Sequence, residues 1–165
     1  MNKSKPSYGG FSLVEVVVAL GIVSFCLVVL ISLMPVSLKS VRDARKYAAA
    51  SSAIQKIGVA IREAPGAANQ YMAIGNYSNL VWNVGASSSV NFTWTNISLS
   101  GDPVTGSAPA VVAHVNLVPP TSLVSTGTAQ ISVAWPPSAV WNTASDNWNN
   151  AQGSVSEWMI FVPKQ

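Results

Sequence analysis

The sequence predicts an α+β fold in which a long N-terminal α-helix, first transmembrane and then amphipathic, packs on a small antiparallel β-sheet domain. Two observations favour this class. A stretch near the N-terminus is nearly free of charge, and the second half is rich in Ser, Thr, Asn, Gly and Pro with short runs of β-forming residues. The chain has 165 residues, enough for one globular domain, and 9% of them are charged, against about 25% in an average soluble domain.

The apolar stretch covers residues 11–38, where Glu15 is the one charged side chain. Residues 16–38 are 23 consecutive uncharged positions, which as a helix extend roughly 34 Å and cross a hydrocarbon core of about 30 Å. A removable signal peptide is the alternative, but its apolar core is usually about 7–15 residues long and ends at small residues. This stretch ends instead at a basic cluster, Lys39, Arg42, Arg45 and Lys46.

Residues 39–64 predict an amphipathic continuation of this helix. Five residues recur at three- and four-residue spacing and so share one helix face: Tyr47, Ala50, Ile54, Ile57 and Ile61. The sequence Ala-Pro-Gly at residues 64–66 is expected to end the helix. Further upstream, Pro35 lacks a backbone donor and clashes with the carbonyl of Ile31, so we expect a helix kink or a short break there.

Residues 65–165 predict a β-rich globular domain. Alternating or short apolar runs indicate five strands, at residues 80–82, 90–95, 111–118, 129–135 and 158–162. Turn-forming Gly, Pro and Asp residues lie between several of these runs. Five short strands joined by turns favour an antiparallel sheet.

Composition excludes several kinds of function. A single cysteine, Cys26, cannot form an internal disulfide, and the single histidine, His114, has no partner pattern typical of catalysis, so we expect no enzyme activity, metal site or cofactor. Asp102 and Asp146 are too few to suggest a calcium site. From residue 64 onward there is one Lys or Arg against three acidic residues, so we expect no nucleic-acid partner.

A lone carboxylate in an apolar span is a candidate functional group. Glu15 is the fifth residue after Gly10, and Phe11 follows the glycine directly. A short basic leader, this Gly-Phe pair, the glutamate and the long apolar helix together resemble the class III signal of type IV prepilins and type II secretion pseudopilins. The resemblance is strong over residues 10–38 and implies a pilin-like fold.

The resemblance implies a role for each of these residues. A prepilin peptidase would cut after Gly10, removing residues 1–10 as a leader, and would N-methylate Phe11. Glu15 would then pair with the amine of Phe11, on its own or a neighbouring subunit, during filament assembly. The implied partners are other pilin or pseudopilin subunits, the peptidase, an inner-membrane assembly platform and membrane lipid.

Within the family, residues 13–22 and the following Ala- and Ile-rich helix look closest to minor subunits of the pilin V-like or pseudopilin I-like type. Residues 19–38 also resemble the Verru_Chthon cassette protein B group. Major pilins usually carry their helix-breaking proline at the position of Ser32 rather than Pro35, and many have a C-terminal cysteine pair that this chain lacks. Both departures favour a minor subunit.

Two interpretations of function remain open. The first is a structural filament subunit with a single pass through the bacterial inner membrane and a periplasmic C-terminal domain. The basic residues at 39–46 conflict with this topology, because the positive-inside rule would place them in the cytoplasm. The alternative is a membrane-anchored binding module, for a glycan or a protein, that never enters a filament.

A segment rich in Trp and Asn near the C-terminus is the candidate binding loop of such a module. It contains Trp141, Asn142, Asn147, Trp148, Asn149 and Asn150. Indole rings stack on sugars and amides hydrogen-bond to them, or to another subunit. The alternative is that these tryptophans, like the other four in this half of the chain, pack in the sheet and its core.

Overall fold

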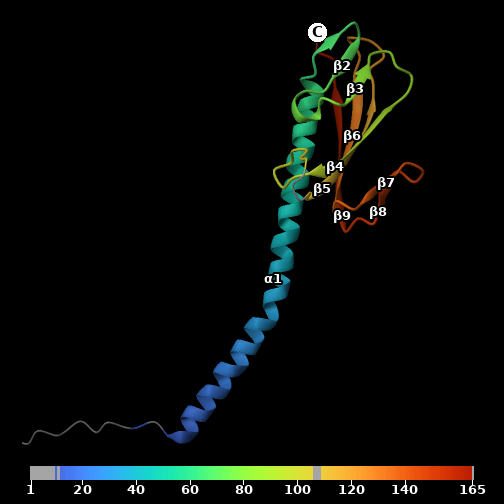
Figure 1. The fold of residues 1–165 in the computed structure, drawn as a ribbon. Coiled ribbons are helices and arrows are strands. Elements are labelled where there is room, and N and C mark those ends of the chain that lie inside the picture. Colours follow the sequence, from blue (N-terminus) through green and yellow to red (C-terminus); the bar gives the residue numbers. More distant parts are fainter. Residues whose placement is uncertain (1–9, 11, 106–108, 165) are drawn as a thin grey trace, which may run out of the picture. The chain divides into compact units, whose positions relative to one another are not determined.

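The computed structural model describes residue 10, residues 12–105 and residues 109–164, and within them it contains one α-helix, one short 3-10 helix and nine strands (Figure 1). The helix, α1, spans Leu13–Arg62. The chain divides into two compact units, Met1–Arg42 and Asp43–Gln165, so the boundary between them falls inside α1.

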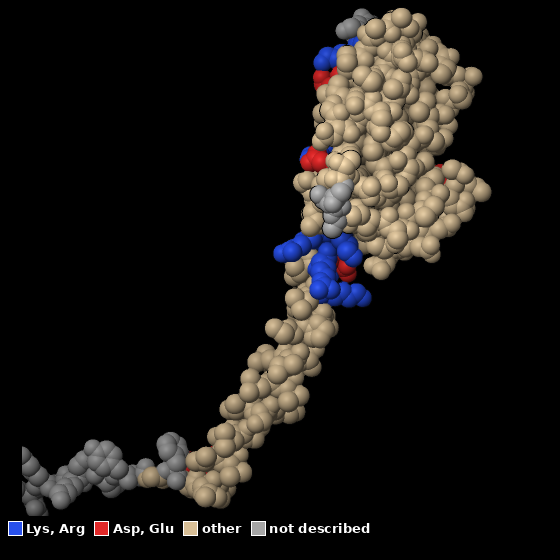
Figure 2. Space-filling model, viewed as in Figure 1, with Lys and Arg blue, Asp and Glu red and all other residues tan. Residues whose placement is uncertain are grey.

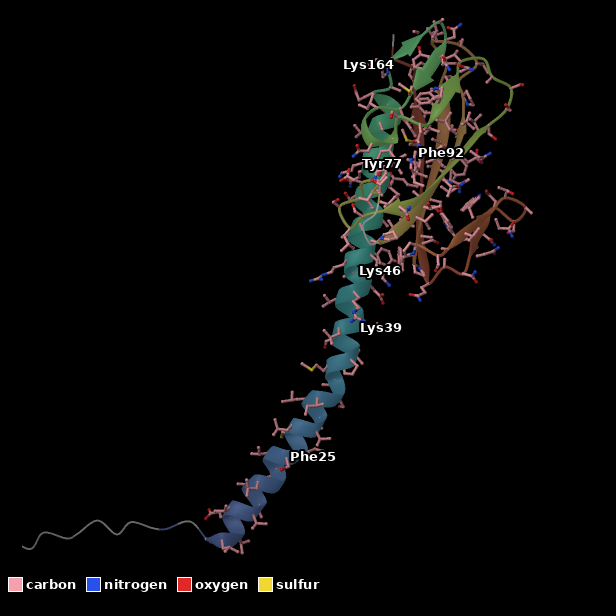
Figure 3. All side chains as sticks on the ribbon, in the orientation of Figure 1. Phe25, Lys39, Lys46, Tyr77, Phe92 and Lys164 are labelled. Atoms are coloured by element: carbon pink, nitrogen blue, oxygen red, sulfur yellow. The ribbon has the colours of Figure 1, made fainter. Side chains whose placement is uncertain are left out.

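In the N-terminal unit, the side chains of α1 project on all sides of the helix (Figure 3, where Phe25 is labelled). The large apolar side chains between Leu13 and Leu38 are 42–80% exposed, which is the pattern of a helix that needs an apolar surrounding. The helix continues through Pro35 without interruption, so the expected short break is wrong. A helix tolerates an internal proline at the loss of one hydrogen bond. The kink at Pro35 stays a prediction.

In the second unit, the last turns of α1 pack on an antiparallel sheet, which confirms the α+β class. Eight positions of this part of the helix are buried: Ala49, Ala50, Ala53, Ile54, Ile57, Gly58, Ala60 and Ile61. Tyr47, the first member of the predicted seam, is 55% exposed, so the seam prediction is wrong at that end. Its ring nevertheless meets the ring of Trp135 edge-on, with 4.8 Å between centroids.

The main sheet has four antiparallel strands in the order β4-β5-β6-β9. These strands are β4 (Val90–Ile97), β5 (Val111–Val118), β6 (Gly127–Trp135) and β9 (Gly153–Phe161). On one face, here called the inner face, alternate residues such as Val115 and Ile131 join the core that includes α1. The opposite, outer face carries His114, Ser132 and their alternate neighbours. Four of the five predicted strands are therefore found in one sheet.

The predicted strand at residues 80–82 belongs to a different sheet. It corresponds to β3 (Val81–Asn83), which pairs with β2 (Gln70–Met72), and β2 pairs with β1 (Gly66–Ala67). A 3-10 helix, η1 (Gly75–Tyr77), lies between β2 and β3. The rings of Tyr71 and Trp82 stack between the paired strands at 5.8 Å. An apolar run predicts a strand but not its partner, which explains why one sheet was expected.

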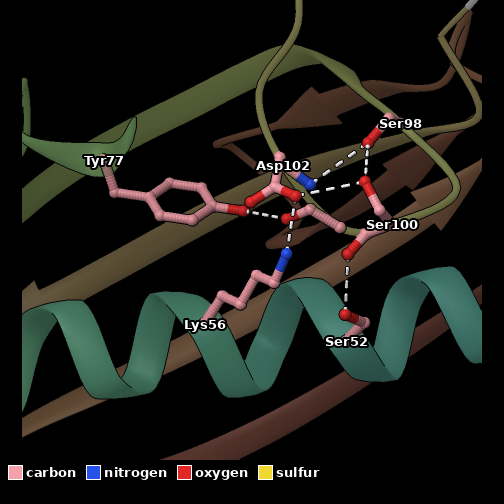
Figure 4. A network of polar contacts seen from close by, with 7 residues as sticks. Ser52, Lys56, Tyr77, Ser98, Ser100 and Asp102 are labelled. Atoms are coloured by element: carbon pink, nitrogen blue, oxygen red, sulfur yellow. Dashed lines mark hydrogen bonds and ion pairs between the residues drawn. The ribbon is translucent and has the colours of Figure 1, made fainter. Parts of the chain in front are cut away.

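A polar network fastens the loop after β4 to α1 (Figure 4). Lys56 Nζ donates to Asp102 Oδ2 at 2.6 Å, and Ser52 Oγ donates to the carbonyl oxygen of Ser100 at 2.8 Å. Asp102 Oδ2 also accepts a hydrogen bond from Ser100 Oγ at 3.1 Å. The loop is thus held to two successive turns of the helix.

Gly101 allows this loop to approach α1 closely. Its φ is +83°, a conformation that side chains disfavour, and a Cβ there would lie 2.7 Å from the backbone nitrogen of Ala53. The carbonyl of Gly101 accepts a hydrogen bond from the buried Tyr77 hydroxyl. Burial, and to a lesser extent the charge of Asp102, raises the pKa of Tyr77 well above its ordinary value, so this hydroxyl stays a donor.

Candidate functional site: the start of the N-terminal helix

A capping box begins α1. Ser12 Oγ accepts a hydrogen bond from the Val14 N–H at 3.2 Å, and a carboxylate oxygen of Glu15 accepts one from the Ser12 N–H at 3.4 Å. The Ser12 carbonyl accepts the first helical hydrogen bonds. This reciprocal arrangement satisfies donors that a helix otherwise leaves unpaired, and it places a negative charge at the positive end of the helix dipole.

The role of Ser12 in the capping box was not predicted from the sequence. The signal was present, because Ser-Leu-Val-Glu at residues 12–15 matches the Ser/Thr-x-x-Asp/Glu pattern that precedes an apolar helix. The capping box gives Glu15 a local structural role in the chain with its leader attached. It also holds the carboxylate against the Ser12 N–H, one residue beyond Phe11.

Gly10 is exposed, and a Cβ added to it would meet no atom of the described residues within 4 Å. The fold itself therefore does not require glycine at this position. Phe11, the residue expected to become the methylated N-terminus, lies outside the described residues, as do leader residues 1–9. The cleavage and methylation assignments remain predictions.

The serine hydroxyls in the uncharged part of α1 are also compatible with an apolar surrounding. The hydroxyls of Ser24, Ser32 and Ser37 donate to the carbonyl oxygens of Leu20, Val29 and Leu33, at 2.7, 2.7 and 3.3 Å. These bonds matter because lipid offers hydroxyl groups no partner. Among the described residues, α1 is the one helix long and apolar enough to cross a membrane. Cys26 lies on it and is exposed.

The basic residues that follow the uncharged span lie on α1 as the sequence indicates. Figure 2 shows Lys and Arg gathered along the helix just beyond the span. Lys39, Arg42 and Arg45 are exposed, and Lys46 lies 3.9 Å from Asp43 in a weak ion pair. Their position directly after the uncharged span keeps the conflict with the positive-inside rule.

A family model described as the prokaryotic N-terminal methylation motif matches residues 5–31. The match contains Gly10, Phe11 and Glu15 together with most of the apolar span. No curated protein and no solved structure matches the chain.

The match supports a type IV prepilin-like protein, and it confirms the resemblance drawn from residues 10–38. Proteins with this motif are pilins and pseudopilins processed by a prepilin peptidase, and they are structural rather than enzymatic. The motif and the apolar helix together indicate membrane anchoring. Pilin subunits and the peptidase follow as general partners.

The second candidate site, the Trp- and Asn-rich segment, folds as a hairpin on the outer face of the main sheet. It contains β7 (Val140–Asn142) and β8 (Asn147–Asn149). Trp141 stacks on His114 with centroids 4.2 Å apart, and Trp148 Nε1 donates to Ser132 Oγ at 2.8 Å. The segment is therefore two short strands rather than a loop. Its two tryptophans are engaged in holding the hairpin to the sheet, and ligand binding there stays a prediction.

The asparagines of this segment shape its turns. Asn142 Oδ1 accepts a hydrogen bond from the Ala144 N–H, and Asn147 Oδ1 accepts one from Ser145 Oγ, both at 2.9 Å. Asn150 adopts a positive φ of 59°, which asparagine tolerates better than most residues. The richness in Asn thus has a local structural reason.

His114 lies under this hairpin, and one of its two ring nitrogens lacks a hydrogen-bond partner in the described part of the chain. Its side chain is buried, its Nδ1 lies 2.9 Å from Thr93 Oγ1, and its Nε2 has no hydrogen-bond partner among the described residues. Burial lowers the pKa of His114, and the nearby charge of Asp146 opposes that shift. No group of three or more His, Cys, Asp or Glu side chains in the described part of the chain could hold a metal ion.

Proposed function

We propose that this chain is a minor subunit of a type IV pilus-like or type II secretion-like filament. The observation that carries the proposal is the N-terminal methylation motif at residues 5–31, at the head of an apolar helix whose first turn holds Glu15. Residues 1–10 are the leader, residues 11–38 the transmembrane and assembly helix, residues 39–64 the amphipathic helix and residues 65–165 the globular domain.

Processing creates the positive charge with which the Glu15 carboxylate would pair. Cleavage after Gly10 exposes an amine at Phe11, which prepilin peptidase then methylates and which stays cationic. At about 4 Å and an effective dielectric constant of about 20, a carboxylate and an amine attract each other by about 4 kcal/mol. Because Glu15 already accepts a hydrogen bond from the Ser12 N–H, its carboxylate is available next to the new terminus.

In an assembling filament, this pairing would involve the terminus of a neighbouring subunit. A paired charge among apolar helices sets the register between them, because a slipped helix leaves the carboxylate unpaired. Before assembly, the subunit waits in the inner membrane with its globular domain on the periplasmic side. The assembly platform and the other pilin-like subunits are its partners there.

The minor role is favoured by two sequence features. The proline of the span is Pro35, where major pilins usually have one at the position of Ser32, and the chain has one cysteine and thus no disulfide-bounded loop. The rival function, an anchored binding module, rests on the Trp- and Asn-rich hairpin. The inward contacts of Trp141 and Trp148 give that rival less support.

The test is to replace Glu15 in cells that contain the prepilin peptidase and the filament system. Glu15→Val makes the helix more apolar and should leave membrane insertion intact, while the chain disappears from sheared filaments. Glu15→Gln is the matched control for size, and it should fail in the same way because the charge is what pairs. Wild-type amounts of the Glu15→Val chain in filaments would refute the pairing role.

A further inference from the structure

The free side of β9 is open along its whole length. β9 pairs with β6 on one side, and none of the strands in the described residues pairs with its other side. Within the described ranges, no main-chain group of β9 makes a hydrogen bond outside the β6 ladder. Edge strands are usually guarded by Lys, Pro, a bulge or an inward-pointing charge, and on β9 the one such feature is Glu157, opposite Ile131 on the inner face. Residues 153–162 contain neither Lys nor Pro, and β9 pairs with β6 without a register shift.

At this edge, side chains are exposed on the outer face of the sheet and a groove lies on the inner face. On the outer face, Trp158 and Ile160 are 65% and 66% exposed. On the inner face, a groove of about 270 Å³ lies between β9 and the part of α1 in the same unit. Its lining combines apolar residues such as Ile54 and Met159 with the charged side chains of Arg62 and Glu157. An added strand would cover the apolar side chains of Trp158 and Ile160 on the outer face and complete the main-chain ladder.

The opposite edge of the sheet, β4, is open over most of its length. At its end, Asn96 and Ile97 are tied to residues 103 and 104 of the same chain. Residues 90–95 make no such main-chain bonds in the part of the chain that the structure describes. On the outer face of β4, Asn91, Thr93 and Thr95 are exposed.

The direction of the strands relates these two edges. A sheet of four antiparallel strands has edge strands that run in opposite directions, so β4 and β9 are antiparallel to each other. When two copies of the chain lie in the same orientation, β9 of one and β4 of the other therefore meet as an antiparallel pair, the better ladder geometry. Two β9 strands from copies in that orientation would run parallel instead.

We propose that the β9 edge is a strand-addition site for the β4 edge of a second copy of this chain. Thr side chains on β4 of the second copy would lie beside Trp158 and Ile160, and cross-strand pairs of this kind stabilise sheets. β4 carries no charged residue and β9 carries Glu157 alone, so no like charges meet across the new pair. A polypeptide strand is the occupant because main-chain groups are what the edge lacks.

This contact is heterologous, because it joins two different edges of the same sheet. Such contacts generate open chains of subunits unless a rotation closes them into a ring. The pairing deepens the proposed role as a filament subunit and rests on that role for its biological setting. It supplies a lateral contact between globular domains, separate from the pairing at Glu15.

The experiment uses the full chain in detergent micelles with Cys26→Ser, which removes the one native cysteine. Asn91→Cys on β4 is combined in turn with Ser154→Cys, Ser156→Cys and Trp158→Cys on β9. All four positions lie on the outer face, and the three pairs sample three registers. Asn91 and Trp158 of one chain are joined by Asn116 and Gln130, three strand spacings of about 4.8 Å. That separation exceeds the Cα limit of about 7 Å for a disulfide within one chain.

Mild oxidation of at least one double variant should give a ladder of dimers, trimers and longer species on non-reducing gels. Each single variant should stay monomeric, because the proposed contact always joins unlike edges. Dimers from a single β9 cysteine would show that β9 pairs with β9 and would overturn the proposal. Monomers from all three double variants would overturn it as well.

A second variant tests the same edge without cysteine. Trp158→Lys with Ile160→Lys places two charges on an edge that is already exposed, so the fold should tolerate both. The ladder of the better of the Ser154→Cys and Ser156→Cys double variants should fall at least tenfold, since both leave residue 158 free for the lysine. Val124→Lys, at a position 80% exposed outside the sheet, is the matched control and should leave the ladder unchanged. If the chain with two lysines on β9 gave as much cross-linked ladder as the same double-cysteine variant without them, the result would contradict the proposal.

The outcomes separate this pairing from the filament role. If the Trp158→Lys, Ile160→Lys chain enters filaments normally and no double variant cross-links, strand pairing is wrong and the filament role stands. If the ladder forms while the wild-type chain never co-purifies with filaments, the pairing stands and the filament role fails.

Discussion

Lys56 on α1 and Asp102 in the loop after β4 form an ion pair with 2.6 Å between Nζ and Oδ2. The hydrogen bond from Lys56 is the main cause that lowers the pKa of Asp102, with smaller contributions from Ser100 and Asn76, while partial burial opposes the shift. Because the folded-state pKa lies below the ordinary value, Asp102 stabilises the fold at neutral pH. That contribution is lost as the pH falls through the folded-state pKa.

Asp102→Asn should therefore lower the stability of the globular unit at pH 7 and change little at about pH 2. The pair is partly exposed, so the expected loss is about 0.5–1 kcal/mol, or about 2–6 °C in Tm. Thermal unfolding of the full chain in detergent, followed by near-UV circular dichroism, measures it. Glu63→Gln removes the exposed pair with Lys164 and is the matched control, with a smaller shift. Equal shifts at both pH values would contradict the electrostatic explanation.

Gly101→Ala should destabilise the globular unit by about 1–3 kcal/mol, since it combines a disfavoured φ with a steric clash. The φ is +83° and the new Cβ would lie 2.7 Å from the Ala53 nitrogen. Gly75→Ala is the control, because Gly75 has a φ of +65° but open space around it. Chemical denaturation of both variants gives the comparison. If the two lose the same stability, the close approach to α1 contributes nothing.

Periodicity predicted the long elements well. Residues 111–118 are β5 residue for residue, and the seam of Ile54, Ile57 and Ile61 is buried as expected. Pairing could not be predicted, because β3 has the same kind of apolar run as the main-sheet strands but hydrogen-bonds to β2. The hairpin was missed for a related reason. Its Asn-rich sequence favours turns, and the contacts of Trp148 with Ser132 that hold it come from distant strands.

His114 should make the outer face sensitive to acid. Burial lowers its pKa in the fold, so the unfolded chain binds the proton more readily. Stability is therefore full above the ordinary histidine pKa of about 6.5 and falls as the pH drops below it. His114→Phe keeps a ring to stack on Trp141 and should abolish the change between about pH 6.5 and pH 5. Thermal unfolding at several pH values tests this, and an unchanged pH dependence in the variant would assign it to other groups.

The N-terminal motif was the most predictable part of the chain, because it is a linear sequence pattern that a family model can match. Gly10, Phe11 and Glu15 are close in sequence, and the family match covers all three. The exception was Ser12, whose side chain and backbone complete the capping box with Glu15. Contacts between distant segments, such as Lys56 with Asp102, leave no comparable pattern in the sequence.

Cleavage after Gly10 should depend on the glycine itself, whereas the fold should not. The described fold does not need glycine at residue 10, since a Cβ there would meet none of its atoms within 4 Å. Gly10→Val should therefore leave the melting curve of the globular unit unchanged, while cleavage falls at least tenfold because the peptidase can no longer approach the scissile backbone closely. Mass spectrometry of the membrane-purified chain should find a methylated Phe11 terminus in the wild type and the leader retained in the variant. Gly21→Val, also at an open glycine on the exposed helix, is the matched control and should be cut normally. An intact Met1 in wild-type chain from cells with active prepilin peptidase would remove the basis for the filament role.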